Sequence, residues 1–362
     1  MLRDSRQAPQ RASPACCRRS PADTSSTPID YQSPIQGKTV TQNKEIFLGP
    51  SYYRDLLPEG SNLLQDHGYS LVENNTDDAI SPEELRKMGH DLHGAIVGME
   101  TWDAAGMDAH PNLKILSKCG VGVDKIDLKA ARERGILVTN TPGLNSNAVA
   151  EVAVGLMINI FRQLSLSQEA AKSGDRTIFN GPELTGKTVG LVGMGSVGAH
   201  LVRRLKGFDV QVKVYDPYLA LSGQSDSAFE LCDLATVLSS ADVVSLHAPL
   251  TDETHHMINA DSLALFKRGS YLVNTARGGL VDESALYAAL TNGQLAGAAL
   301  DVFEVEPLDP NNPLLALSNV VSTTHLGANS FEALTGVGLA NAHAVIDTFS
   351  GLEPANMVSS MH

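Results

Sequence analysis

The chain has 362 residues and a formal net charge of −14 at pH 7, and 43% of its residues are hydrophobic. This length suggests two domains, or one large domain, with an ample core. The acidic balance argues against nucleic acid or an anionic membrane surface as a general partner, although a local cationic pocket can still bind a small anion. The four cysteines have neither metal-ligand nor disulfide spacing, so we expect a reducing environment and no metal site.

The first 43 residues differ in composition from the rest of the chain. They are rich in Arg, Ser and Pro, and Asp4 is their only acidic residue before Asp23. Without apolar periodicity, residues 1–43 are expected to be a disordered extension. The cytoplasm is the expected location. Because an Arg- and Ser-rich start is also typical of a transit peptide, an organelle matrix is the alternative. No membrane partner is expected, because the apolar stretch Ala148 to Phe161 is too short to span a bilayer.

From Glu45 onward, short apolar strands alternate with helical segments, a pattern that predicts an α/β fold with a parallel sheet. The expected strands of the first unit are Glu45–Leu48, Ser70–Glu73, Gly94–Gly98, Leu113–Ser117 and Ile136–Thr139. Helices are expected from Tyr53, from Pro82, near Trp102 and at Leu128–Arg134.

Two loops of the first unit are candidate ligand-binding segments. Cys119–Asp124 (CGVGVD) follows the fourth strand, and Asn140–Glu151 (NTPGLNSNAVAE) follows the fifth. Open parallel sheets bind ligands beyond the carboxyl ends of their strands. For Gly120 and Gly122, a simple strand-to-helix turn is the alternative interpretation.

A long apolar helix is predicted between the two units, from about Ser146 to Leu166. Its apolar residues occupy more than one face. Such a helix is typically buried on both sides, either between domains or against another subunit.

The stretch from Lys187 to Asp216 predicts a βαβ unit with a glycine-rich first turn. A buried strand, Thr188–Val192, precedes the turn, and a helix follows it to about Leu205. A GxGxxG turn in this context is typical of dinucleotide binding. Asp216 lies where a carboxylate hydrogen-bonds the adenosine ribose and disfavours a 2′-phosphate, so NAD is the expected cofactor.

Each glycine of this turn has its own expected role. Gly193 permits the tight turn, Gly195 lets the backbone approach a pyrophosphate, and Gly198 allows close packing of the helix on the strand. The backbone amides of Ser196 and Val197 begin the helix and are expected to bind phosphate.

The second unit continues the alternation of strands and helices. Its further strands are expected near Val212–Tyr215, Val243–Leu246, Tyr271–Asn274, Gly297–Val302 and Val320–Thr323. A last helix is expected from Phe331 to about Phe349.

Three ionisable residues follow successive strands of the second unit: Arg277, Glu306 and His325. Strand ends of a doubly wound sheet gather at one edge, which here also carries the glycine turn. Each residue alone has a structural alternative, but together they predict a site that oxidises an alcohol beside a carboxylate.

The chemistry of the three groups suggests how they divide the reaction. His325 is suited to exchange the hydroxyl proton, and Glu306 to hold its imidazole in one tautomer. Arg277 is suited to bind the substrate carboxylate. A fourth residue, Asp301, is expected to accept a hydrogen bond from the nicotinamide carboxamide.

These motifs resemble a known family. GMGSVG with Asp216, NTARGGLVDE, ALDVFEVEP and HLGA look like the D-isomer-specific 2-hydroxyacid dehydrogenases, from about Glu45 to the end. CGVGVDKIDLKAA and VTNTPGLNSNAVAE look most like the phosphoglycerate dehydrogenase branch, in its short form without a regulatory domain.

The resemblance implies a set of site residues. Arg277, Glu306 and His325 would be catalytic. The implied NAD contacts are Thr141, Ser196, Val197, Asp216, Thr275 and Asp301. The substrate carboxylate would also contact the backbone of Val121 and Gly122, and Lys118 stands where some phosphoglycerate enzymes have arginine.

The resemblance also implies a domain organisation and an assembly. The expected architecture is two doubly wound parallel α/β domains, Rossmann- or flavodoxin-like, with a discontinuous substrate-binding domain. That domain would comprise residues 44–145 and 327–362, and the NAD-binding Rossmann domain residues 146–326. A homodimer is expected to form through the NAD-binding domain.

The expected function is NAD-dependent oxidation of 3-phospho-D-glycerate to 3-phosphohydroxypyruvate, a step toward serine. The nearest alternative is NADH-dependent reduction of glyoxylate, hydroxypyruvate or another D-2-hydroxyacid precursor, because those enzymes would share every catalytic residue. A remote alternative is an NAD-sensing, corepressor-like binding protein, since such proteins keep the catalytic set.

Overall fold

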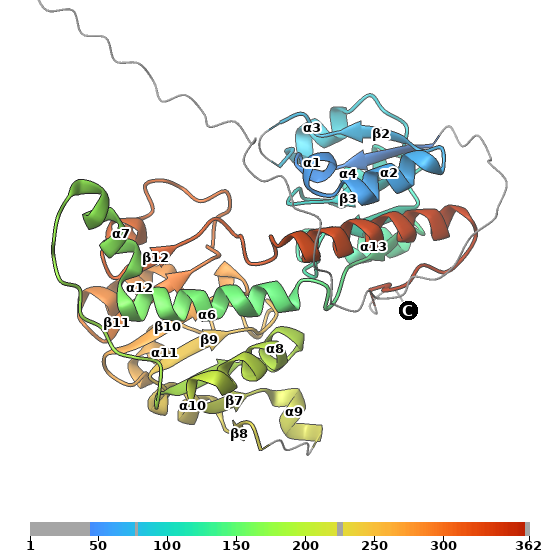
Figure 1. Ribbon diagram of the computed structural model, residues 1–362. Helices are drawn as coiled ribbons and strands as arrows, with labels where there is room; N and C mark the ends of the chain where they lie inside the picture. The colour runs from blue at the N-terminus through green and yellow to red at the C-terminus, as the bar shows by residue number, and fades with distance from the viewer. Residues whose placement is uncertain (1–43, 77–78, 223–226, 359–362) are drawn as a thin grey trace, which may run out of the picture. The chain divides into compact units, whose positions relative to one another are not determined.

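The structure is a computed structural model that describes residues 44–76, 79–222 and 227–358. All of these belong to one compact unit, residues 40–362, within which the strands form two separate parallel sheets (Figure 1). The extension predicted for residues 1–43 lies outside the described residues.

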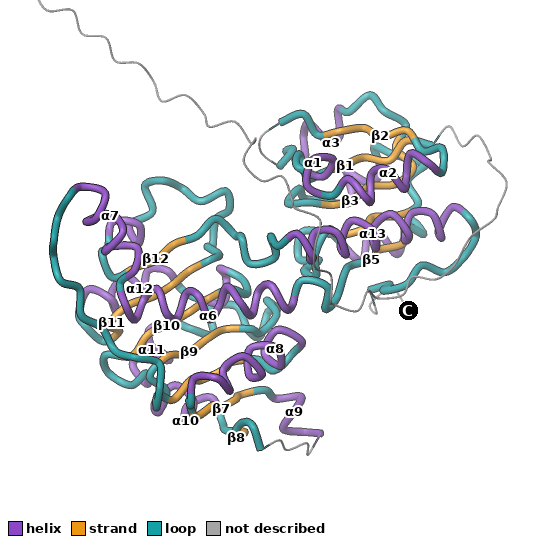
Figure 2. Tube along the Cα trace, viewed as in Figure 1, coloured by secondary structure: helices purple, strands orange, loops and turns teal. Residues whose placement is uncertain are grey.

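The first sheet has five parallel strands in the order β2-β1-β3-β4-β5. Its strands are β1 (Glu45–Leu48), β2 (Ser70–Glu73), β3 (Leu92–Val97), β4 (Ile115–Lys118) and β5 (Leu137–Thr139). The helices between them are α1 (Tyr53–Leu56), α2 (Pro58–Asp66), α3 (Pro82–Lys87), α4 (Ala104–Asp108) and α5 (Leu128–Glu133). Figure 2 shows these strands flanked by helices.

Alternating side chains of these strands build a core on each face of the sheet. Ile46 and Leu48 of β1 belong to one hydrophobic cluster, whereas Phe47 belongs to the other. Successive strand residues point to opposite faces, so a strand that is apolar throughout must be covered on both sides. This explains why the strands read as continuous apolar runs.

The last helix of the chain, α13 (Phe331–Phe349), packs on this first sheet. The Tyr53 hydroxyl donates to the Gly338 carbonyl at 3.0 Å, and Asn341 Nδ2 donates to Ser117 Oγ at 2.8 Å. The first sheet is therefore completed by a segment from the other end of the chain. The exact boundaries of the two domains stay a prediction.

The second sheet has seven parallel strands in the order β12-β11-β10-β9-β6-β7-β8. They are β6 (Thr188–Val192), β7 (Gln211–Tyr215), β8 (Glu230–Leu231), β9 (Val243–Leu246), β10 (Ser270–Asn274), β11 (Leu295–Leu300) and β12 (Val320–Ser322). The direction of winding reverses between β6 and β9, the position where doubly wound sheets bind ligands. The predicted fold class, two parallel α/β sheets, is confirmed.

Helices cover both faces of the second sheet. They are α6 (Ser146–Arg162), α7 (Leu164–Ser173), α8 (Ser196–Leu205), α9 (Pro217–Ser222), α10 (Leu234–Ser240), α11 (Ala260–Leu265) and α12 (Glu283–Thr291), with short 3-10 turns at Lys206–Phe208, Gly278–Leu280 and Pro313–Ala316. Residues of α6 and α8 form one core cluster with the strands, and residues of α10, α11 and α12 form the other.

The prediction of one continuous helix from Ser146 to Leu166 was wrong. The helix breaks at Gln163, whose left-handed backbone (φ 53°) separates α6 from α7, and the two are bent by 62°. Gln163 Nε2 donates to the Asn180 carbonyl at 2.8 Å, and the backbone at Gly181 crosses the end of α6 so closely that an added Cβ would lie 1.7 Å from the Phe161 oxygen. The crossing segment ends α6, a tertiary contact that apolar periodicity does not reveal.

The helices α6 and α7 are also the segment to consider when asking whether the chain could cross a membrane. Among the described residues, no single helix is long and apolar enough to cross a bilayer; the pair reaches that length and composition only when both helices are taken together across their bend. Most of α6 is instead part of the hydrophobic core.

Candidate active site

The glycine turn between β6 and α8 has the geometry that a dinucleotide requires. Gly193 has φ 98°, and an added Cβ there would lie 2.7 Å from the backbone of His247. A Cβ on Gly198 would lie 2.8 Å from the Gly193 carbonyl oxygen, whereas one on Gly195 would meet nothing within 4 Å. Two glycines are thus needed for packing, and the third leaves space over the turn.

The helix that follows the turn begins without a side-chain cap. Its N-cap residue is Gly195, and the first helical residues are Ser196 and Val197. Uncapped backbone amides at a helix N-terminus, together with the helix dipole, favour a phosphate.

Asp216 organises the same turn. Its Oδ2 accepts from the Met194 amide at 2.8 Å, and its Oδ1 accepts from the amides of Tyr218 and Leu219 at 2.9 Å each. The carboxylate therefore fixes the glycine turn and the start of α9. The spacing of Asp216 from the turn predicted a contact with ribose and discrimination against a 2′-phosphate, but not this structural role.

His325 and Glu306 form a hydrogen-bonded pair, with Nδ1 2.8 Å from Oε2. The other oxygen of Glu306 accepts from the Phe303 amide at 3.1 Å. Burial acts to raise the pKa of Glu306, but the hydrogen bond and charge of His325, helped by the Phe303 amide, outweigh it and lower the pKa. Because Nδ1 is engaged, Nε2 is the nitrogen of His325 that can exchange a proton with a ligand.

Asp301 holds the loop that carries His325. Its buried carboxylate accepts from the Thr323 hydroxyl at 2.6 Å and from the amides of Leu326 and Gly327 at 2.9 and 2.8 Å. Its carbonyl oxygen also accepts from the His325 amide at 2.9 Å. An ionised carboxylate accepts about four hydrogen bonds, so three internal donors leave room for about one more. Holding the histidine loop is a role that the sequence did not indicate.

Arg277 lies against the CGVGVD loop. Its Nε donates to Asp124 Oδ1 at 3.2 Å and its Nη1 to the Ala276 carbonyl at 2.7 Å. A Cβ on Gly122 would lie 1.6 Å from Arg277 Nη2, so only glycine allows this approach. Burial raises the pKa of Asp124, but the charge and hydrogen bond of Arg277 outweigh it and lower the pKa. Val121, next to Gly122, is 42% exposed.

Two threonines predicted to contact NAD differ in their partners. Thr141 is buried; its Oγ1 accepts from the Gly120 amide at 3.1 Å, so it supports the CGVGVD loop. Thr275 is also buried, but among the described residues its hydroxyl has no hydrogen-bond partner. A buried hydroxyl without a partner carries a free-energy penalty that a bound ligand can remove.

The predicted substrate residue Lys118 ends β4 and is half-buried. Its Nζ donates to the Gly98 carbonyl oxygen. Burial lowers the pKa of its ammonium group. Nearby, the carboxylate of Glu100 is almost completely buried, and the sequence did not single it out.

The residues present fit a dinucleotide. The space over Gly195, the uncapped start of α8 and the unpartnered Thr275 hydroxyl all lie at the carboxyl edge of the second sheet. Within the described parts of the chain, no group of three or more His, Cys, Asp or Glu residues is arranged to hold a metal ion.

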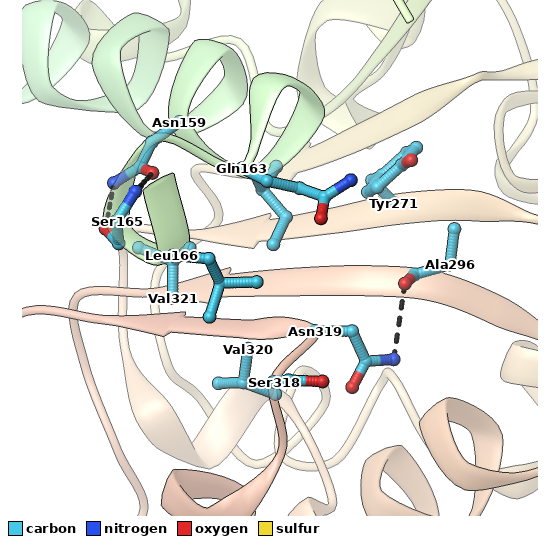
Figure 3. Close-up of a pocket in the computed structure, with 11 residues that line it drawn as sticks. Asn159, Gln163, Ser165, Leu166, Tyr271, Ala296, Ser318, Asn319, Val320 and Val321 are labelled. Atoms are coloured by element: carbon cyan, nitrogen blue, oxygen red, sulfur yellow. Dashed lines mark hydrogen bonds between the residues drawn. The ribbon is translucent and has the colours of Figure 1, made fainter. Parts of the chain in front are cut away.

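A cavity of about 200 Å³ lies at the opposite end of the sheet (Figure 3). Asn159 and Gln163 line it from the end of α6, and Tyr271 and Asn319 from the beginnings of β10 and β12. None of the predicted site residues lines this cavity.

Comparison with known proteins identifies relatives of the nucleotide-binding part and of most of the chain. Residues 154–327 match the family described as D-isomer specific 2-hydroxyacid dehydrogenase, NAD binding domain. A D-3-phosphoglycerate dehydrogenase of Archaeoglobus fulgidus is 41% identical over 283 residues, 77% of this chain, and the chain spans about half (54%) of that relative. A glyoxylate reductase of Thermofilum pendens is 39% identical over 317 residues, 85% of this chain and 94% of the relative.

A solved structure matches as well. The crystal structure of the TT0316 protein from Thermus thermophilus superposes with a TM-score of 0.78 at 34% identity. The match covers 87% of this chain and 99% of that one.

Proposed function

The chain belongs to the D-isomer specific 2-hydroxyacid dehydrogenase family and binds NAD, and we propose that it oxidises the 2-hydroxyl of 3-phospho-D-glycerate. The chemical part of this proposal rests on the hydrogen bond between His325 Nδ1 and Glu306 Oε2, at 2.8 Å. This pair lies at the edge of the second sheet that also has the glycine turn. The substrate is proposed from the similarity to phosphoglycerate dehydrogenases and from Lys118 at the end of β4.

In this proposal His325 and Glu306 move the proton. Nε2 of His325 takes the proton of the 2-hydroxyl as the carbonyl forms, and Glu306 stabilises the resulting imidazolium through Nδ1. NAD, when bound, accepts the hydride that leaves C2. The product is the 2-oxo acid, 3-phosphohydroxypyruvate, and the reverse direction uses the same groups.

In the same proposal, two cationic residues, Arg277 and Lys118, bind the anionic groups of the substrate. Arg277, fixed by Asp124, binds the carboxylate together with the backbone of Val121 and Gly122 and polarises the carbonyl oxygen. Lys118 contributes a charge to the phosphate. Thr141, Thr275, Ser196, Val197, Asp216 and Asp301 are the proposed NAD contacts.

A second candidate function is the reduction of glyoxylate or hydroxypyruvate by NADH. It is supported because the glyoxylate reductase is about as similar to this chain, at 39% identity over 317 residues, as the phosphoglycerate dehydrogenase is, at 41% identity over 283 residues. The engagement of Lys118 Nζ by the Gly98 carbonyl also leaves fewer donors for a phosphate.

The decisive experiment compares substrates with the purified chain. NADH production from 3-phospho-D-glycerate is measured at alkaline pH beside NADH consumption with hydroxypyruvate and glyoxylate. The proposal expects a higher kcat/KM for the phosphorylated acid. A preference for the unphosphorylated acids would replace the proposed substrate by the second candidate, and the absence of turnover with any of them would favour an NAD-sensing role.

We also propose a pathway, a domain division and a dimer for this protein. The product would enter serine biosynthesis in the cytoplasm, the substrate-binding domain would comprise residues 44–145 and 327–362, and two chains would pair through the NAD-binding domain. Sedimentation equilibrium tests the dimer, and a monomer at micromolar concentration would contradict it.

A further inference from the structure

A buried carboxylate, that of Glu100, lies just beyond the end of β3 and is not used by the proposed mechanism. Both oxygens of Glu100 accept from the Gly98 amide, at 2.9 and 3.0 Å, and the side chain is 1% exposed. A Cβ on Gly49 would lie 2.0 Å from Glu100 Oε1, so the carboxylate occupies the space beside the end of β1. This placement needs a glycine at position 49 as well as an acid at position 100.

Gly98 connects this carboxylate to Lys118. The amide of Gly98 donates to Glu100, and its carbonyl oxygen accepts from Lys118 Nζ. The two charged groups are thus attached to opposite sides of one residue, just beyond the end of β3. A carboxylate buried this completely is usually paired with a cation.

The other groups near Lys118 do not supply its counter-charge. The titratable groups that interact with it are Glu100, Cys119, Asp124 and Arg277. Burial raises the pKa of the Cys119 thiol to about 11, so the thiol is uncharged at neutral pH. Asp124 is already paired with Arg277 at 3.2 Å. Glu100 is the remaining carboxylate of this group; burial raises the pKa of Glu100, and the charge of Lys118 opposes that rise.

We propose that Glu100 is a positioning residue that keeps Lys118 in its ammonium form at the end of β4, where it binds the anionic group on C3 of the substrate. This inference rests on the proposed function for the identity of that group. Burial lowers the pKa of the lysine and so favours its neutral form, and the charge of Glu100 opposes that shift. Glu100 acts through Lys118 and does not itself contact the substrate.

The test is a double-mutant cycle with Glu100→Gln and Lys118→Met, each close in size to the original side chain. Glu100→Gln is expected to raise the KM for 3-phospho-D-glycerate about tenfold, with more effect at pH 9.5 than at pH 7.5 and kcat nearly unchanged. In the Lys118→Met background the same substitution should change KM by less than about twofold, because its effect requires the lysine.

The controls separate positioning from general damage to the fold. The KM for unphosphorylated D-glycerate should not change in Glu100→Gln. Glu83→Gln, which removes an exposed carboxylate of the same sheet unit, should leave both KM values unchanged. If the single variant Glu100→Gln does not fold, the double variant is compared with Lys118→Met alone: a change in KM of more than about twofold between these two would show that Glu100 acts without the lysine and would overturn the proposal.

A second measurement does not depend on the substrate. Lysine labelled with ¹³C at Cε gives a signal for Lys118 that is absent in Lys118→Met, and its titration is followed by NMR. The proposal expects this signal to titrate at lower pH in Glu100→Gln than in the unaltered chain. An unchanged titration, or a KM for phosphoglycerate that falls in Glu100→Gln, overturns the proposal. A shifted titration without any phosphoglycerate turnover would reject the proposed substrate and retain the role of Glu100.

Discussion

His325, the proposed catalytic base, has an orientation that is set by two other residues. Glu306 fixes Nδ1, and Asp301 accepts from the backbone of the histidine loop. His325 itself has a left-handed backbone (φ 56°), an unusual conformation for a residue with a side chain, and the Asp301 hydrogen bonds on both sides of it hold that conformation. The geometry of the proposed proton transfer therefore depends on Glu306 and Asp301 as well as on His325.

Glu306→Gln is expected to lower kcat by about 10- to 100-fold, because a neutral amide cannot stabilise the imidazolium that forms in the oxidation. The KM for the substrate should change little, since Arg277 and Lys118 are intact. Steady-state kinetics at several pH values measure both constants. Glu304→Gln is the matched control: it removes the carboxylate of another pair, 3.0 Å from His256 Nε2, outside the site. Equal losses in the two variants would argue against a specific role for Glu306.

At the scale of elements, the β6–α8 connection tolerates little change at two of its glycines. The helix approaches the strand so closely that the space for a Cβ at Gly198 is taken by the Gly193 carbonyl. Sequence reasoning anticipated this requirement because it follows from the turn itself. It did not anticipate the break at Gln163, which depends on a segment crossing from residues 180–181.

Gly198→Ala is expected to destabilise the fold by about 1–3 kcal/mol, because the added methyl group must displace the backbone of the turn. The KM for NAD should rise in the same variant, since the turn then moves relative to the start of α8. Urea denaturation and kinetics with varied NAD measure the two effects. Gly155→Ala is the control, because a Cβ there meets nothing within 4 Å and alanine favours a helix. A wild-type midpoint for Gly198→Ala would contradict the packing argument.

At the scale of the whole molecule, the pH dependence of stability reflects partly buried groups such as His247. This residue lies beside the glycine turn, and its Nε2 is 2.9 Å from Ser245 Oγ. Burial lowers its pKa from 6.5 to about 4. Between these values the unfolded chain binds a proton that the folded chain does not, so the stability from this residue is complete above pH 6.5 and is lost as the pH falls toward 4.

His247→Gln should therefore flatten the pH dependence of the unfolding free energy between pH 6.5 and pH 4, by up to about 3 kcal/mol. Urea unfolding at pH 4.5, 5.5 and 7.5 gives the measurement. His67→Gln, at an exposed histidine, serves as the control and should preserve the slope. If both variants keep the wild-type slope, another group causes the loss of stability in acid.

The fold class, the NAD-binding turn and the family could all be predicted from the sequence, because each depends on residues that are close together in the chain. A βαβ unit with three glycines is a local pattern, and so are the motifs that contain Arg277, Glu306 and His325. The assignment of site residues to NAD or substrate remains a prediction, made partly from the chemistry of the residues and partly from the resemblance.

Only the tertiary structure decided which distant groups meet. Arg277 and Asp124 are 153 positions apart, and Asn341 and Ser117 are 224 apart, yet each pair is hydrogen-bonded. The Glu100–Gly98–Lys118 arrangement likewise depends on the register of β3 beside β4. Such contacts arise when sheets and helices pack, and packing joins residues by position in space, which the order of the chain does not specify.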